Sequence, residues 1–219
     1  MKIALFGGTF DPIHSGHLSA AHAVLQTFAL DQILFVPAGR PPHKRGRPLT
    51  PFFHRYAMVV LACAGVPEFV PSLLEAPAGR GTRPHYSIAT VRRVQATLSP
   101  GDRLYFLIGA DAFLEIGQWH QWKQLLKACD CIIVSRPGFS ISAIETVVPP
   151  ELRSGPATEQ TIPLRRTSLH LLPTVNADVS SSTIRRLAAE AKPLAGFVPD
   201  PVADYIRKVG LFANETEAE

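Results

Sequence analysis

Two histidines, His14 and His17, lie three residues apart in the segment GTFDPIHSGH, which runs from Gly8 to His17. Residues at this spacing share one face of a helix, so both imidazoles would face the same region. An imidazole can donate a hydrogen bond to a phosphate oxygen in its neutral or its charged form. Gly16, between the two histidines, lacks a side chain where a substrate has to approach closely. The pattern predicts a phosphoryl or nucleotidyl site in which His14 and His17 are catalytic.

The residues before the histidines predict the backbone that holds them. A short apolar run at 3–6 is typical of a first β-strand, Gly7 and Gly8 then turn the chain, and a helix is expected to begin near Ile13. Such a turn presents backbone N–H groups and a helix N-terminus to an anion. A metal site is the alternative, but Asp11 in the turn is a poor third ligand and the spacing does not match zinc patterns.

A second motif, VSSSTIR, ends at Arg185. Its serines Ser180, Ser181 and Ser182 can cap a following helix at 183–190. Capping alone would explain one serine but does not require three followed by an arginine. Arg185 can bind phosphate oxygens with a bidentate fork, so we expect a second phosphate-binding helix N-terminus here.

Apolar strands alternate with helices along the chain. Strands are expected at 3–6, 32–37, 69–70, 104–108, 130–135 and 169–172, and helices at 15–28, 50–64, 87–97, 119–127, 183–190 and 201–209. Continuous apolar strands between helices indicate a parallel sheet covered on both faces. The sequence therefore predicts an α/β fold, a Rossmann-like doubly wound parallel sheet in a single domain at 1–213. We interpret 137–169 as a surface excursion and 214–219 as a disordered acidic tail.

Composition narrows the class of protein. The chain has 219 residues, of which 46% are hydrophobic and 18% charged, as in an ordinary globular domain. No apolar stretch approaches the ~20 residues of a membrane span, and the first apolar run is too short for a signal peptide. Three cysteines, Cys63, Cys129 and Cys131, are expected to be core thiols. We expect a cytoplasmic protein without a membrane partner.

The net charge of +4 leaves two kinds of anionic partner open. The densest basic cluster lies at 40–47 and suits a polyphosphate substrate as well as a nucleic-acid backbone. RNA binding adds aromatic stacking partners, and this loop has none before Phe52. A small anionic ligand is therefore favoured over nucleic acid.

The two motifs together resemble the (T/H)xGH and ISSTxIR signatures of the nucleotidyltransferase superfamily. The resemblance implies transfer of a nucleoside monophosphate by direct in-line attack on the α-phosphate of a triphosphate. The second motif would then grip the β- and γ-phosphates of ATP. A divalent ion, most plausibly Mg²⁺, would bridge the triphosphate through substrate oxygens and water, without a dedicated protein cage.

Three further strings are similar to strings of bacterial nicotinate-nucleotide adenylyltransferases. They are PPHK at 41–44, PHYSIAT at 84–90, and LIGADAF with GQWHQW at 107–122. This resemblance implies ATP and nicotinate mononucleotide as substrates, in NAD biosynthesis. The residues expected to bind ATP are Gly7, Gly8, Thr9, Phe10, Gly16, Gly109, Asp111, Arg136, Ser180, Ser181, Ser182 and Arg185. Those expected to bind nicotinate mononucleotide are Thr9, Lys44, Ser87, Asp111, Trp119 and His120, with Trp119 stacking on the pyridine ring.

The sequence departs from the family strings in two ways. Ser87 and Ser182 replace threonine and keep the hydroxyl, whereas His85 and Ala89 replace polar residues of other types. The choice of acceptor therefore stays open between nicotinate mononucleotide, nicotinamide mononucleotide and phosphopantetheine. A non-enzymatic nucleotide- or RNA-binding module is the alternative from another class. The sequence does not predict an oligomeric state.

Overall fold

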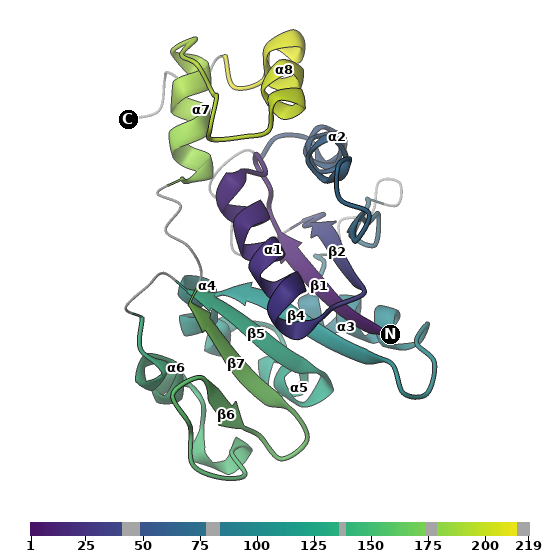
Figure 1. Cartoon of the computed structure of the whole chain (residues 1–219), viewed down its shortest axis with the longest axis vertical. Coiled ribbons are helices and arrows are strands. Elements are labelled where there is room, and N and C mark those ends of the chain that lie inside the picture. The colour runs from purple at the N-terminus through teal and green to yellow at the C-terminus, as the bar shows by residue number, and fades with distance from the viewer. Residues whose placement is uncertain (41–48, 78–83, 136–138, 174–178, 214–219) are drawn as a thin grey trace.

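The computed structural model describes residues 1–40, 49–77, 84–135, 139–173 and 179–213. Within these residues, seven strands form one sheet in the order β3-β2-β1-β4-β5-β7-β6. Only the β6–β7 pair is antiparallel. Figure 1 shows α1 across one face of the sheet, with α3 and α5 behind it. This arrangement confirms the predicted α/β fold with a mostly parallel, Rossmann-like sheet.

The strands are β1 (Lys2–Gly8), β2 (Gln32–Pro37), β3 (Phe69–Pro71), β4 (Arg103–Gly109), β5 (Asp130–Ser135), β6 (Thr161–Pro163) and β7 (Ser168–Pro173). The helices are α1 (Ser15–Phe28), α2 (Phe52–Cys63), α3 (Ser87–Gln95), α4 (Ala110–Leu114), α5 (Trp122–Ala128), α6 (Ile141–Val147), α7 (Ser181–Ala189) and α8 (Asp200–Val209). Two 3₁₀ turns, η1 (Ile116–Gln118) and η2 (Pro150–Leu152), complete the described elements.

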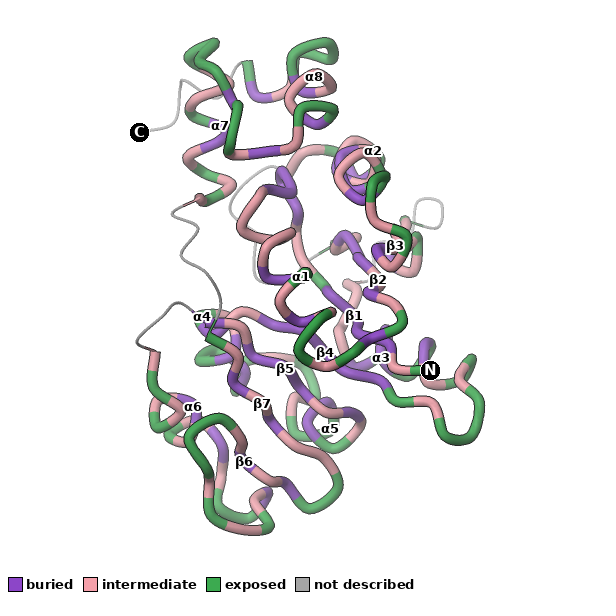
Figure 2. Tube along the Cα trace, viewed as in Figure 1, coloured by how far each residue is buried: buried purple, intermediate pink, exposed green. Residues whose placement is uncertain are grey.

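Successive residues of the central strands enter two separate cores. In β4, Phe106 packs into the core under α3 and α5, whereas Tyr105 and Leu107 pack into the core under α1 and α2. Figure 2 shows the resulting buried run through β1, β4 and β5. Burial on both faces explains why these strands are apolar throughout rather than alternating. The three cysteines are buried and free, which confirms that they are core thiols.

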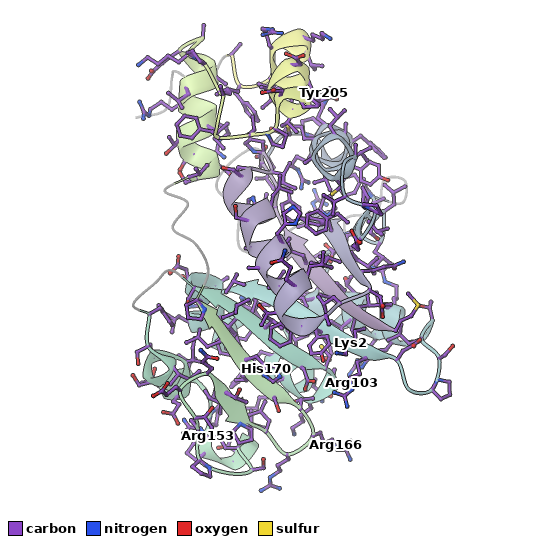
Figure 3. All side chains as sticks on the ribbon, in the orientation of Figure 1. Lys2, Arg103, Arg153, Arg166, His170 and Tyr205 are labelled. Carbon is purple, nitrogen blue, oxygen red and sulfur yellow. The ribbon has the colours of Figure 1, made fainter. Side chains whose placement is uncertain are left out.

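The order of the strands determines where a ligand can bind. From β1 the chain runs outward through β2 and β3, then returns through α3 to β4 on the other side of β1. The connections leaving β1 and β4 diverge and open a crevice at the carboxyl ends of these strands. At the opposite end of the sheet lie basic residues, including Lys2, Arg103 and Arg166 (Figure 3). Those side chains are too far from the crevice to take part in its chemistry.

Two predictions about the elements were wrong. The segment at 137–169 is more than a surface excursion, because α6 and β6 lie within it and Ile144 and Ile162 are fully buried. The helix expected to begin at Trp119 begins at Trp122, since Gln121 has a left-handed backbone with φ 52° that interrupts a helix. Trp119 therefore lies on a connection beside the crevice.

Candidate active site

The turn after β1 is shaped by close packing around Phe10. A Cβ on Gly8 would lie 2.9 Å from ring atoms of Phe10, so this position excludes a side chain. The ring of Phe10 is 1% exposed and packs edge-on against Phe6 and His17, at centroid separations of 5.4 and 5.1 Å. Its backbone is left-handed, with φ 48°. Phe10 thus belongs to the core.

His14 and His17 lie against each other at the N-terminus of α1. His14 is the N-cap residue and is 8% exposed. The two rings are 3.7 Å apart with an interplanar angle of 30°. The backbone N–H of His14 donates to Nδ1 of His17 at 3.2 Å. The structure therefore brings the two predicted catalytic residues together, with the half-buried Gly16 in the first helical turn between them.

The surroundings keep both imidazoles neutral near pH 7. Burial lowers the pKa of His14 from 6.5 to about 4. Burial also lowers the pKa of His17 well below 6.5, and the neighbouring His14 lowers it further. Because Nδ1 of His17 accepts a hydrogen bond, that nitrogen carries no proton, and the neutral ring holds its proton on Nε2. His17 is thus a neutral N–H donor.

The second motif packs directly onto the first. Ser181 donates from Oγ to the carbonyl of Pro12 at 3.0 Å, and Arg185 donates from Nη1 to the carbonyl of Asp11 at 2.7 Å. Arg185 is 7% exposed. One edge of its guanidinium therefore binds the backbone of the turn after β1, a role that the sequence did not suggest.

Ser180 and Ser182 form the exposed tip of this helix N-terminus. Ser180 is the N-cap of α7, and its Oγ accepts from the backbone N–H of Thr183 at 3.1 Å. The hydroxyls of Ser180 and Ser182 are 2.9 Å apart. The capping that the serines suggested is present, and the free end of α7 stands beside the turn that carries the histidines.

A pocket of about 370 Å³ opens on the other side of the same turn. Its walls come from the carboxyl ends of β1 and β2, from Phe106 of β4, from the N-terminus of α3, from α4 and from the residues on either side of η1. Six of the predicted binding residues line it, namely Gly7, Gly8, Thr9, Ser87, Trp119 and His120. Lining residues that the sequence reasoning missed include Glu75, His85, Tyr86 and Glu115.

Aromatic rings form one wall of this pocket. Trp119 packs edge-on against Phe106 of β4, with centroids 6.3 Å apart. Tyr86, the N-cap of α3, stacks on His120 with centroids 4.1 Å apart. The wall therefore presents flat, partly exposed rings to a ligand, with the N-terminal N–H groups of α3 beside them.

The remaining predicted residues lie outside this pocket. Gly109 is the N-cap of α4, and Asp111 is exposed in the first turn of that helix. Ala112 and Glu115, which follow Asp111, line the pocket. Lys44 and Arg136 fall outside the described residues.

Arg55, which does not line the pocket, is a further site residue that the sequence did not predict. It lies in α2, is 1% exposed, and donates three hydrogen bonds to backbone carbonyls around the pocket. Desolvation lowers the pKa of Arg55, while Asp11 and Glu75 oppose this shift. A lone arginine on the otherwise apolar face of the helix FFHRYAMVVLAC was the available signal.

No three His, Cys, Asp or Glu side chains come together as metal ligands in the described part of the chain. Of the helices in the described ranges, none is long and apolar enough to cross a membrane.

The sequence and the fold were compared with known proteins. Residues 5–187 match the family described as cytidylyltransferase-like. A protein of Solibacter usitatus named probable nicotinate-nucleotide adenylyltransferase is 43% identical, and the match covers 97% of this chain and 100% of that protein. A protein of Geobacter metallireducens with the same name is 39% identical, and the match covers 98% of this chain and 100% of that protein. Nicotinic acid mononucleotide adenylyltransferase of Plasmodium falciparum, complexed with APC, has a similar fold, with a TM-score of 0.70, 19% identity and 97% coverage of both chains.

Proposed function

The chain belongs to the nicotinate-nucleotide adenylyltransferase family, and we propose that it transfers AMP from ATP to nicotinate mononucleotide. The products are deamido-NAD and pyrophosphate, which makes the protein an enzyme of NAD biosynthesis. The described fold and the site at the carboxyl ends of β1 and β4 support this assignment.

The observation that carries the proposal is a single turn shared by two half-sites, one for the acceptor and one for ATP. Gly7, Gly8 and Thr9 line the pocket on the side of α3. On the side of α1, the following residues lead to the His14–His17 pair. An acceptor in the pocket and a triphosphate beside the histidines would meet across two glycines, where no side chain separates them.

The chemistry needs alignment and charge stabilisation rather than a protein nucleophile. A phosphate oxygen of the acceptor attacks the α-phosphorus of ATP, and pyrophosphate leaves from the opposite side. His17, with its proton on Nε2, donates a hydrogen bond to the α-phosphate and stabilises the charge that develops in the transition state. A neutral donor keeps this role over a wide pH range because it does not have to be protonated first.

The ATP half-site is proposed to use the turn of β1, the free end of α7 and the first turn of α4. Ser180 and Ser182 face the β- and γ-phosphates from the helix N-terminus, and the guanidinium of Arg185 adds positive charge. Phe10 contributes its backbone only. Mg²⁺, when bound to the phosphates, neutralises part of their charge.

The acceptor half-site is proposed to be the pocket itself. Trp119 stacks on the pyridine ring, and the backbone N–H groups at Ser87 and His120 bind the nicotinate carboxylate. Asp111 binds a ribose hydroxyl. Lys44 and Arg136 are proposed for the acceptor phosphate and for the adenine respectively, from the sequence resemblance alone.

Three further proposals concern the whole chain. We place it in the cytoplasm, where three free thiols stay reduced. We expect no nucleic-acid partner, because the basic cluster at 40–47 has no aromatic residue before Phe52 on which a base could stack. Residues 1–213 are proposed to act as one domain, and 214–219 as a tail.

Pyrophosphate release by the purified protein with ATP and Mg²⁺ tests the proposal. Nicotinate mononucleotide, nicotinamide mononucleotide and phosphopantetheine are compared as acceptors. We expect release with the nicotinate compound. Release with another acceptor alone would overturn the assignment of the pocket, and no release with any would favour a binding module. A parallel reaction with Mg²⁺ removed by a chelator is expected to lose turnover.

A further inference from the structure

We propose that Arg55 is a positioning residue of this active site, which holds the turn after β1 in the conformation that presents its backbone donors to the phosphates. The inference rests on the proposed function and deepens it. Arg55 touches no substrate and acts through the backbone.

The contacts of Arg55 join the two strand ends that form the floor of the pocket. Nη1 donates to the carbonyl of Thr9 at 2.6 Å, at the end of β1. Nη2 donates to the carbonyl of Ala38 at 2.8 Å, just beyond β2, and Nε donates to the carbonyl of Thr50 at 2.8 Å, before α2. Thr9 and Ala38 both line the pocket. One rigid, planar group therefore sets the position of both strand ends.

The contact with Thr9 has a specific consequence for the next peptide group. The Thr9–Phe10 peptide is trans, so its carbonyl and its N–H point in opposite directions. With the carbonyl of Thr9 held by Arg55, the N–H of Phe10 points away from α2. No described residue accepts a hydrogen bond from this N–H. It is thus a buried donor without a described partner, in the residue whose ring contacts His17.

The conformation that Arg55 holds is one that the chain would not adopt by itself. Phe10 has φ 48°, and left-handed backbone is unfavourable for a bulky residue. A charged donor on the carbonyl also polarises the peptide group, which strengthens the N–H as a donor. Arg185 and Ser181 hold the next two carbonyls, those of Asp11 and Pro12, from α7. The turn is thus fixed from two sides.

Lysine could not replace Arg55 in this role. Its ammonium has three donors but lacks the planar fork that reaches three carbonyls in different directions. Arg55→Lys keeps the charge between Asp11 and Glu75, so it changes the geometry of the hydrogen bonds more than the electrostatics. Arg93 on α3 is exposed and provides the matched control, Arg93→Lys.

The experiment measures kcat and KM for ATP and nicotinate mononucleotide in the wild type, R55K and R93K. Rates are referred to the folded fraction, measured by circular dichroism. We expect the wild type and R93K to agree, and R55K to lose at least about 10-fold in kcat while each KM changes by less than about 3-fold. Millimolar guanidinium, but not urea, is expected to raise the kcat of R55A.

Three results would overturn the inference. The first is a kcat for R55K within about 2-fold of the wild type, and the second is a change in KM alone. The third is a fall in activity that only follows the loss of folded protein, because Arg55 would then serve the stability of the fold. A wild type that releases no pyrophosphate would instead refute the proposed function.

Discussion

Acidification should destabilise this protein through the histidine pair, and replacing His14 by Asn should remove part of that effect. Burial lowers the pKa of His14 in the folded protein from 6.5 to about 4. Between these two values the unfolded chain binds a proton that the folded protein does not bind. The stability contributed by the neutral ring is thus complete above pH 6.5 and is lost as the pH falls toward 4.

The size of the effect follows from the two pKa values. At about pH 5, protonation of His14 in the unfolded chain lowers the free energy of unfolding by about 2 kcal/mol relative to about pH 8. The loss approaches about 3 kcal/mol at still lower pH, where the folded protein also begins to protonate. His17 shifts in the same direction and adds to the loss.

Urea unfolding followed by circular dichroism at about pH 8 and about pH 5 measures this difference. The wild type is expected to lose about 2 kcal/mol more on acidification than His14→Asn. Acid-sensitive groups away from this pair contribute equally to both proteins and cancel in the comparison, whereas His17 loses one cause of its lowered pKa in His14→Asn, which widens the difference. His22→Asn, at an exposed position of the same helix, should behave as the wild type. If His14→Asn lost as much stability as the wild type, the neutral, desolvated state of His14 would be refuted.

The remaining predictions concern single positions of the site. His17→Ala should lower kcat by about 100-fold or more and change the KM for ATP by less than about 3-fold, because the N–H of His17 acts in the transition state. Steady-state kinetics in which only KM changed would refute this. Trp119→Ala should raise the KM for nicotinate mononucleotide by about 10-fold through loss of stacking, whereas Trp122→Ala, outside the pocket, should leave this KM unchanged. Equal effects of the two substitutions in the same assay would contradict the proposed stacking of the pyridine ring on Trp119. Gly39→Ala should destabilise the fold by about 1–3 kcal/mol in urea unfolding, because its Cβ would lie 2.0 Å from a backbone oxygen. Gly117→Ala, with nothing within 4 Å, is the control and should leave stability unchanged.

Local chemistry in the sequence was enough to predict the site at the end of β1. The run GTFDPIHSGH carries a strand end, a turn and a helix start within a few residues. The positions of His14 and His17 on one face depend only on helical spacing, which is a local property. The order of apolar strands and helices predicted the parallel sheet for the same reason, since burial on both faces is visible in the composition of each strand.

The limits of local signals explain the errors at 137–169 and at Trp119. The prolines of 137–169 indicated a loop, but Ile144 is buried where α6 packs on α4, and Ile162 is buried where β6 pairs with β7. The helical spacing of Trp119 and Trp122 indicated one helix, but the left-handed Gln121 separates them. Tertiary packing determined both outcomes.

Arg55 and Arg185 show most clearly what only the tertiary structure decided. Arg185 was expected to face a phosphate, yet one edge of its guanidinium holds the carbonyl of Asp11 across 174 positions of sequence. Arg55 had no assigned role, yet it joins the ends of β1 and β2 from a third element. The sequence by itself was enough to place His14 and His17 on one face of a helix that follows an apolar strand, because spacing and burial are local. Which carbonyl a buried guanidinium binds depends on long-range packing, because such hydrogen bonds join elements that no spacing rule connects.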